Sequence, residues 1–316
     1  SVVLAALFVT FACGQLLVSI ENEEGHSIKY TISNEGASPA RILTYGTPFE
    51  GNVFYPLFNI TTEHGVRVPY VGPIARRVSP APESAYFTLP ARANLSISVD
   101  LLPLFSFEEE GLVTIEIILP EINPTLLGVM ISSGIKKQIS EESTAQKVLA
   151  NQYENCTPTE QSQTDAAAQT AQAQAKRARD CMNAGSCNTL ATKWFGSTTT
   201  TNVAYYNFDK SAFTNIYSTL STKGIHAYCN PAGCGANVYA YVYPNDPSQT
   251  VYLCGAFWSQ PNERANTIVH EMSHFKVIAG TEDYEYGKPA CQNLAKTDPY
   301  KASHNADNVC YFSNEA

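Results

Sequence analysis

Two histidines and a glutamate within residues 270–274 constrain the fold of this chain more than any other feature. The segment reads His-Glu-Met-Ser-His, and residues four apart in a helix lie on the same face. The preceding residues 265–269 contain no proline and include the apolar pair Ile268 and Val269, which predicts a helix with one buried face. Both imidazoles then point to one side, with the carboxylate of Glu271 beside them.

This arrangement is half of a catalytic zinc site. Neutral imidazoles are good zinc ligands, and a glutamate directly after the first one can take a proton from a zinc-activated water. The alternative is a helix that carries two polar surface histidines. A catalytic zinc needs a third protein ligand, and Gly280 is a natural helix stop after which the chain could return. The acidic residues that follow it are Glu282, Asp283 and Glu285.

Residues 280–287 provide a second motif, which reads Gly-Thr-Glu-Asp-Tyr-Glu-Tyr-Gly. It resembles the Gly-Thr-x-Asp-x-x-Tyr-Gly signature of the deuterolysin family of aspzincin metalloproteases. The resemblance implies one zinc ion per chain with three protein ligands, which are His270, His274 and Asp283. It also implies that Glu271 is the general base and that Tyr286 stabilises the oxyanion of the tetrahedral intermediate.

A closer likeness covers about residues 152–316. Residues 238–244 and 250–258 look like the segments before the zinc helix in the fungal peptidyl-Lys metalloendopeptidase branch of the family, and residues 305–308 also resemble that branch. The likeness implies a mainly helical, zincin-type domain with a small antiparallel sheet. Within these segments, residues 238–243 and 250–253 read as the two strands of a hairpin. The likeness to zincins implies that its edge strand holds the substrate backbone by strand addition.

Substrate preference follows from the same likeness. In the lysine-specific branch, an aspartate and a glutamate three residues later hold the residue after the cut bond. This chain keeps the aspartate as Asp307 but has Cys310 in the place of the glutamate. We therefore expect Asp307 to bind substrate and the enzyme to prefer a basic residue, lysine, after the cut bond, without strict selection.

The cysteines divide the chain into two halves. There are nine, of which eight lie between Cys156 and Cys310, and an even set of this kind indicates disulfides in an oxidising compartment. The family resemblance implies two bridges, Cys156–Cys229 and Cys234–Cys254. For the remaining four cysteines we expect the bridges Cys181–Cys187 and Cys291–Cys310.

The sequence pattern of the N-terminal half predicts a different kind of domain. Residues 16–131 form short alternating apolar and polar runs separated by turn residues, a pattern typical of a β-sandwich. At 316 residues the chain is long enough for two domains, and the fold class we expect is α+β. The expected segments are a secretory signal remnant at 1–14, a β-sandwich propeptide at 15–135, a linker with a processing site at 136–151, and the peptidase domain at 152–316.

Charge argues against some partners. The formal net charge is −9, and we see no basic cluster beyond residues 176–179, so neither nucleic acid nor an anionic membrane is expected as a partner. The prediction is a secreted, monomeric zinc endopeptidase that is made as a proenzyme, with protein or peptide substrates and its own propeptide as partners. The alternative is a secreted binding or toxin-like protein on a non-catalytic zincin scaffold. A structural zinc site is disfavoured because such sites usually have four protein ligands.

Overall fold

The computed structural model describes residues 16–23, 25–108, 111–118, 126–131 and 151–316. The chain divides into two compact units, the first made of residues 1–72 and 83–144 and the second of residues 73–82 and 145–316. Residues 73–82 thus interrupt the first unit in sequence and fold with the second. The expected signal remnant and all but the last residue of the expected linker lie outside the described residues.

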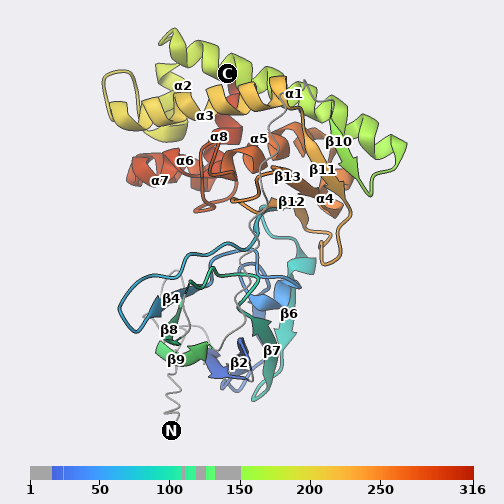
Figure 1. The fold of residues 1–316 in the computed structure, drawn as a ribbon, viewed down its shortest axis with the longest axis vertical. Coiled ribbons are helices and arrows are strands. Elements are labelled where there is room, and N and C mark those ends of the chain that lie inside the picture. Colours follow the sequence, from blue (N-terminus) through green and yellow to red (C-terminus); the bar gives the residue numbers. More distant parts are fainter. Residues whose placement is uncertain (1–15, 24, 109–110, 119–125, 132–150) are drawn as a thin grey trace. The chain divides into compact units, whose positions relative to one another are not determined.

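The first unit consists of short antiparallel strands (Figure 1). The strands are β1 (Leu16–Asn22), β2 (Ser27–Asn34), β3 (Ala40–Leu43), β4 (Phe58–Thr62), β6 (Tyr86–Leu89), β7 (Asn94–Asp100), β8 (Gly111–Ile117) and β9 (Leu126–Ile131). They pair in the orders β1-β2-β7, β3-β6 and β4-β8-β9. In β2, side chains alternate between buried and half-buried, so that Ile28, Tyr30 and Ile32 enter the core, as the period-two pattern predicts. The N-terminal strands are confirmed, and the sandwich arrangement stays a prediction.

The second unit combines helices with one sheet. Its helices are α1 (Pro158–Asn183), α2 (Asn188–Phe195), α3 (Val203–Thr222), α4 (Gly255–Ser259), α5 (Arg264–His274), α6 (Lys288–Thr297), α7 (Pro299–Ser303) and α8 (Ala306–Glu315). Its strands are β5 (Ile74–Arg77), β10 (Gln152–Glu154), β11 (His226–Cys229), β12 (Val238–Val242) and β13 (Thr250–Leu253). The unit therefore has the mainly helical character that the resemblance implied.

The sheet of the second unit corrects one expectation. Its order is β10-β11-β13-β12-β5, and the pairs β10–β11 and β11–β13 are parallel while β12 runs antiparallel to both of its neighbours. The sheet is therefore mixed rather than antiparallel. The reason is that helices α1, α2 and α3 lie between β10 and β11 in the chain, and such a crossover brings the next strand back in the same direction.

Helix α1 shows how local sequence sets this architecture. Thr157 and Glu160 form a capping box at its start, and Pro158 occupies the first turn, where a missing amide proton costs nothing. The residues that it buries are mostly alanines, including Ala167, Ala171, Ala175 and Ala178. Small side chains at this spacing form one face of a helix, and α1 packs against α3 and α5.

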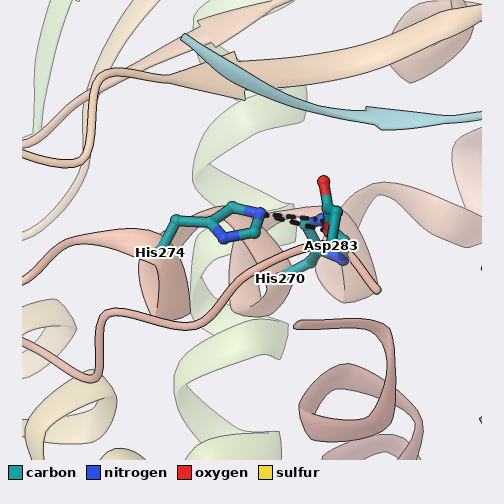
Figure 2. A group of neighbouring side chains, drawn as sticks. All are labelled: His270, His274 and Asp283. Atoms are coloured by element: carbon teal, nitrogen blue, oxygen red, sulfur yellow. Dashed lines mark hydrogen bonds and ion pairs between the residues drawn. The ribbon is translucent and has the colours of Figure 1, made fainter. Parts of the chain in front are cut away.

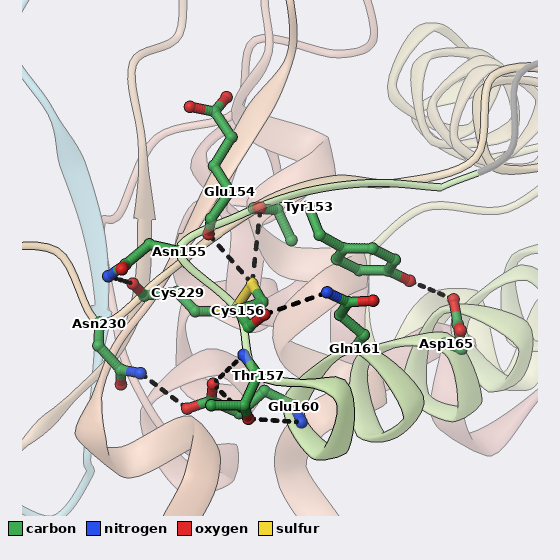
Figure 3. The surroundings of a disulfide bond; sticks show 11 residues. Tyr153, Glu154, Asn155, Cys156, Thr157, Glu160, Gln161, Asp165, Cys229 and Asn230 are labelled. Atoms are coloured by element: carbon green, nitrogen blue, oxygen red, sulfur yellow. Dashed lines mark hydrogen bonds between the residues drawn. A yellow bond between two sulfur atoms is a disulfide. The ribbon is translucent and has the colours of Figure 1, made fainter.

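Three of the four expected disulfides are present: Cys156–Cys229, Cys181–Cys187 and Cys234–Cys254. The first joins the segment before α1 to the end of β11, next to the capping box of α1 (Figure 3). The fourth is absent, because Cys291 and Cys310 are free and buried. Each thiol instead faces a nearby oxygen: Cys291 Sγ lies 3.6 Å from the Glu285 carbonyl oxygen, and Cys310 Sγ lies 3.3 Å from the Asp307 carbonyl oxygen. Burial raises the pKa of the Cys310 thiol, which keeps it neutral.

Loop length predicts how much two of these bridges stabilise the fold. Replacing Cys156 and Cys229 by serine opens a loop with a sequence separation of 73 residues, and the expected loss in the free energy of unfolding is about 4 kcal/mol. The same change at Cys181 and Cys187 opens a separation of only 6 residues, for an expected loss of about 2 kcal/mol. Denaturant unfolding of both variants checks the order, and an equal or larger loss for the short loop would contradict it.

Candidate metal centre

Helix α5 places the two histidines of the motif side by side in the interior. Every residue from Asn266 to His274 is buried, and both imidazoles have no exposed surface. The helix packs against α8 and α1, so its orientation is fixed on more than one side. As expected for residues one turn apart, the Nε2 atoms of His270 and His274 lie 3.1 Å from each other.

The chain then reverses and returns a carboxylate to the same point. Helix α5 ends at His274, earlier than the predicted stop, and Gly280 adopts the left-handed backbone conformation (φ 64°) that the reversal requires. The returning strand pairs with residue 305 through backbone hydrogen bonds of Glu282. This pairing brings Asp283 Oδ1 to 3.2 Å from His270 Nε2 and 3.5 Å from His274 Nε2 (Figure 2).

Hydrogen bonds on the far side of each ring determine which nitrogens face this point. His274 Nδ1 lies 2.8 Å from the Thr281 carbonyl oxygen, which only accepts, so Nδ1 carries the proton and Nε2 presents a lone pair. His270 Nδ1 lies 2.9 Å from Asp307 Oδ1. Bonds of this kind orient metal-binding histidines. Burial lowers the pKa of His274 to about 4, so this ring is neutral at pH 7 and suited to bind a metal.

The charges of His270 and Asp283 favour a cation between the three side chains. Burial opposes a charge on His270, yet the carboxylates of Asp283 and Asp307 raise the pKa of its ring well above the ordinary value. Asp283 Oδ1 is buried and has no hydrogen-bond partner, an arrangement that is costly for a carboxylate oxygen unless a cation balances it. A divalent metal ion would take the place of a proton on His270 and satisfy that oxygen.

The distances between the three ligand atoms fit a tetrahedral zinc ion. Tetrahedral zinc with ligand bonds of about 2.0–2.1 Å separates its ligand atoms by roughly 3.3–3.4 Å. The three separations here are 3.1, 3.2 and 3.5 Å. Two imidazoles and one carboxylate also match the ligand set of catalytic zinc sites, which leave a fourth position for water.

Glu271 lies beside this candidate metal site and is buried with few partners. Its side chain is fully buried, Oε2 has no hydrogen-bond partner, and Oε1 accepts a hydrogen bond of 3.3 Å from the backbone N–H of Arg76. Burial raises the pKa of Glu271 to about 8. A divalent cation beside it would lower that pKa, because an opposite charge favours the carboxylate.

Strand β5 occupies the edge of the sheet beside this glutamate. It pairs antiparallel with β12, with Ala75 opposite Tyr241 and Arg76 opposite Ala240, and the pale blue ribbon that passes over the site in Figure 2 is this strand. The hydroxyl of Tyr286 lies 2.9 Å from the Ala75 carbonyl oxygen. The Ala75–Arg76 peptide bond therefore has Tyr286 at its oxygen and Glu271 at its nitrogen.

Comparison with known proteins agrees with this geometry. A sequence model described as lysine-specific metallo-endopeptidase, of the aspzincin family, matches residues 180–314. An extracellular protease of Aeromonas hydrophila is 32% identical over 90% of this chain and 87% of its own length.

The chain belongs to the aspzincin family.

Two further matches each cover about half of this aspzincin. The peptidyl-Lys metalloendopeptidase of Grifola frondosa is 40% identical over 51% of this chain and 46% of its own length. The solved structure of a zinc peptidase from the same organism is 38% identical, covers 51% of this chain and 99% of its own, and superposes with a TM-score of 0.46. Members of the family are zinc metalloendopeptidases, and this aspzincin is one.

The structure brings together every site residue that the sequence predicted for the aspzincin. Those residues are His270, Glu271, His274, Asp283, Tyr286 and Asp307. Asp307 has more contacts than expected, because it bonds to His270 Nδ1, to the backbone N–H of Gly287 and to Arg76 Nε. Thr281 holds His274 through its carbonyl oxygen.

Sequence reasoning missed the contribution of β5. The segment 74–77 reads Ile-Ala-Arg-Arg, and its two adjacent arginines are a second basic cluster that the charge survey overlooked. A pair of buried arginines in a strand is unusual, but strand pairing between β5 and β12 cannot be predicted from either segment alone. No helix among the residues that the structure describes has the length and apolar character needed to cross a membrane.

Proposed function

We infer that the chain is the secreted proform of this peptidase, in which β5 lies in the cleft as a substrate would. The observation that carries the inference is the position of the Ala75–Arg76 peptide bond between Tyr286 and Glu271, beside three buried metal-binding side chains. Strand addition to a sheet edge is how extended peptides bind to such clefts. Three disulfides and the likeness to an extracellular protease support secretion.

The residues that would hold zinc are His270, His274 and Asp283. Bound there, zinc would supply a Lewis acid for the water and for the substrate carbonyl group. Glu271 accepts the proton of the attacking water and passes it to the leaving nitrogen, at the position where Oε1 now lies 3.3 Å from Arg76 N. Asp307 holds the ring of His270 in place.

Tyr286 acts on the carbonyl oxygen. Its hydroxyl lies between two acceptors, Asp283 Oδ2 at 2.6 Å and the Ala75 carbonyl oxygen at 2.9 Å, and it accepts a hydrogen bond from Arg77 Nη1. Its single proton can serve only one of them fully. As the carbonyl oxygen gains negative charge during attack, it becomes the better acceptor, and the hydrogen bond strengthens where the charge develops.

Replacing Tyr286 by phenylalanine is expected to reduce kcat by about 10²-fold, with KM little changed, because only the transition state loses a hydrogen bond. Kinetics on a quenched peptide substrate check the split between kcat and KM. Tyr284→Phe, on an exposed ring of the same loop, is the matched control. A rise in KM alone would show that Tyr286 binds substrate rather than stabilising the transition state.

The inhibitory role of β5 predicts that Arg76→Ala increases activity. The change removes a buried side chain whose hydrogen bonds hold β5 in the cleft, and the loss of such a charge pair costs about 2–5 kcal/mol. We expect the full-length variant to hydrolyse a small peptide at least about tenfold faster than the wild type. Arg67→Ala, at an exposed position of the first unit, is the control, and equal activity of wild type and Arg76→Ala would contradict inhibition by β5.

Casein digestion with and without a chelator tests the peptidase function itself. The proposal expects digestion that a chelator stops and added zinc restores. Digestion that a chelator leaves unchanged would contradict the role of zinc, and no digestion at all would leave the non-catalytic, toxin-like reading in place. Sequencing the termini of the released peptides then reports which residue follows the cut bond, for which Asp307 predicts a basic side chain.

A further inference from the structure

The side chain of Arg76 fills a polar pocket beside the catalytic glutamate. Its Nε donates to Asp307 Oδ1 at 3.2 Å, Nη2 donates to Glu263 Oε2 at 3.0 Å, and Nη1 donates to Thr267 Oγ1 at 2.7 Å. The guanidinium carbon lies 4.8 Å from the ring centre of Tyr239. The residue is only 3% exposed. We call the group Glu263, Thr267, Asp307 and Tyr239 the arginine pocket.

The backbone on either side of Arg76 shows which substrate residue this pocket receives. Its N–H donates to Glu271, and the carbonyl group before it contacts Tyr286. Arg76 therefore stands where the residue after the cut bond would stand. The side chain that the arginine pocket binds in a substrate is the one on the leaving amine.

We propose that the arginine pocket selects arginine over lysine, and that Glu263 and Thr267 are the residues that read the guanidinium group. The proposal rests on the peptidase function inferred above and adds its substrate class, peptides with arginine after the cut bond. Cys310, three positions after Asp307, presents a buried thiol rather than a carboxylate, 3.8 Å from Asp307 Oδ1. The second carboxylate comes instead from Glu263, at the turn that precedes α5.

The fork shape of the guanidinium group explains the selection. The ammonium nitrogen of a lysine would end near the position of the guanidinium carbon, short of the two Nη atoms that reach Glu263 and Thr267. A methylene group would replace Nε against Asp307. A site built to hydrogen-bond a donor discriminates against an analogue that lacks it, because its acceptors lose their partner. Thr267 is fully buried and cannot turn to water instead, whereas the Glu263 carboxylate is half-buried and would lose its ion pair with the guanidinium group. The face of Tyr239 also suits a planar cation.

A competition assay tests the selection with the full-length chain. Two quenched peptides that differ only in arginine or lysine after the cut bond are offered together, so that the ratio of their product rates equals the ratio of kcat/KM whatever fraction of the enzyme is free of β5. We expect arginine to be favoured at least about tenfold. Glu263→Gln should reduce this ratio at least fivefold, whereas Glu154→Gln, on β10 and outside the cleft, should leave it unchanged.

A second measurement does not depend on catalysis. In a full-length chain that also carries Glu271→Gln, the rate at which added trypsin cuts after residue 76 reports how firmly the pocket holds that side chain. We expect Arg76→Lys and Glu263→Gln each to be cut at least about tenfold faster there than the parent, even though trypsin accepts both basic residues. Cutting within residues 176–179 of α1, at an unchanged rate, shows that the fold is intact.

Two results would overturn the proposal: lysine cleaved as fast as arginine in the competition, or equal protection of residue 76 in the parent and in Arg76→Lys. If neither peptide is cut, even by the Arg76→Ala variant in which β5 is released, the peptidase function is what fails, and the trypsin measurement decides by itself whether the pocket distinguishes arginine from lysine.

Discussion

Glu271→Gln is expected to lower kcat by about 10³-fold or more, because the variant removes the group that takes the proton from water and returns it to the leaving nitrogen. The amide has nearly the same shape as the carboxylate and cannot ionise. The Glu271 side chain is fully buried and its Oε2 has no hydrogen-bond partner, so an amide of the same size breaks no contact there and the fold should not suffer. Thermal unfolding at or above the wild-type temperature is therefore expected.

The measurement combines peptide kinetics with zinc content. A variant that has lost activity and still binds one zinc ion per chain confirms that Glu271 acts on the proton rather than on the metal. Glu285→Gln, an exposed carboxylate fourteen positions later in the chain, is the control and should retain wild-type activity. A Glu271→Gln enzyme with more than a tenth of the wild-type kcat would contradict the role of general base.

Asp283→Ala is expected to abolish zinc binding together with activity. The variant removes one of three ligands and leaves two neutral imidazoles, which alone hold zinc far more weakly. Because bound zinc stabilises the folded chain by mass action, by about 2.7 kcal/mol at a free concentration one hundred times its dissociation constant, the wild type should unfold at a higher temperature with zinc than without.

Glu285→Ala provides the comparison for the ligand experiment, since it removes a carboxylate from the same loop without touching the metal-binding group. Metal analysis and unfolding curves with and without added zinc are the readouts. A zinc-dependent rise in unfolding temperature should occur in the wild type and in Glu285→Ala but not in Asp283→Ala. If Asp283→Ala keeps the rise, another side chain is the third ligand.

The parts of the site that sequence could predict are those built from local signals. Two histidines one turn apart need only a helix, and α5 provides it. Gly280 adopts the left-handed conformation and reverses the chain. The signature at residues 280–287 identified Asp283 as the expected third ligand. Two of the three disulfides followed from family likeness, and Cys181–Cys187 from pairing the cysteines that remained.

The parts that sequence could not predict depend on contacts between distant segments. Strand β5 pairs with β12 across more than 160 residues, and neither strand carries a signal that names its partner. The absent bridge between Cys291 and Cys310 illustrates the same limit, because counting cysteines does not determine which ones meet. Glu263 belongs to no recognisable sequence motif, because its ion pair with Arg76 forms only in the folded chain.

The place of β5 as the outermost strand of the sheet next to β12 has a kinetic consequence for activation. While the backbone is continuous, β5 returns to the cleft in an intramolecular step, so its occupancy does not depend on protein concentration. Once a processing protease cuts the expected linker at residues 136–151, rebinding of β5 to the peptidase becomes a second-order reaction. The lag before full activity should then shorten on dilution. A cleaved proenzyme that is concentrated before release would therefore stay inactive and would become active as it is diluted.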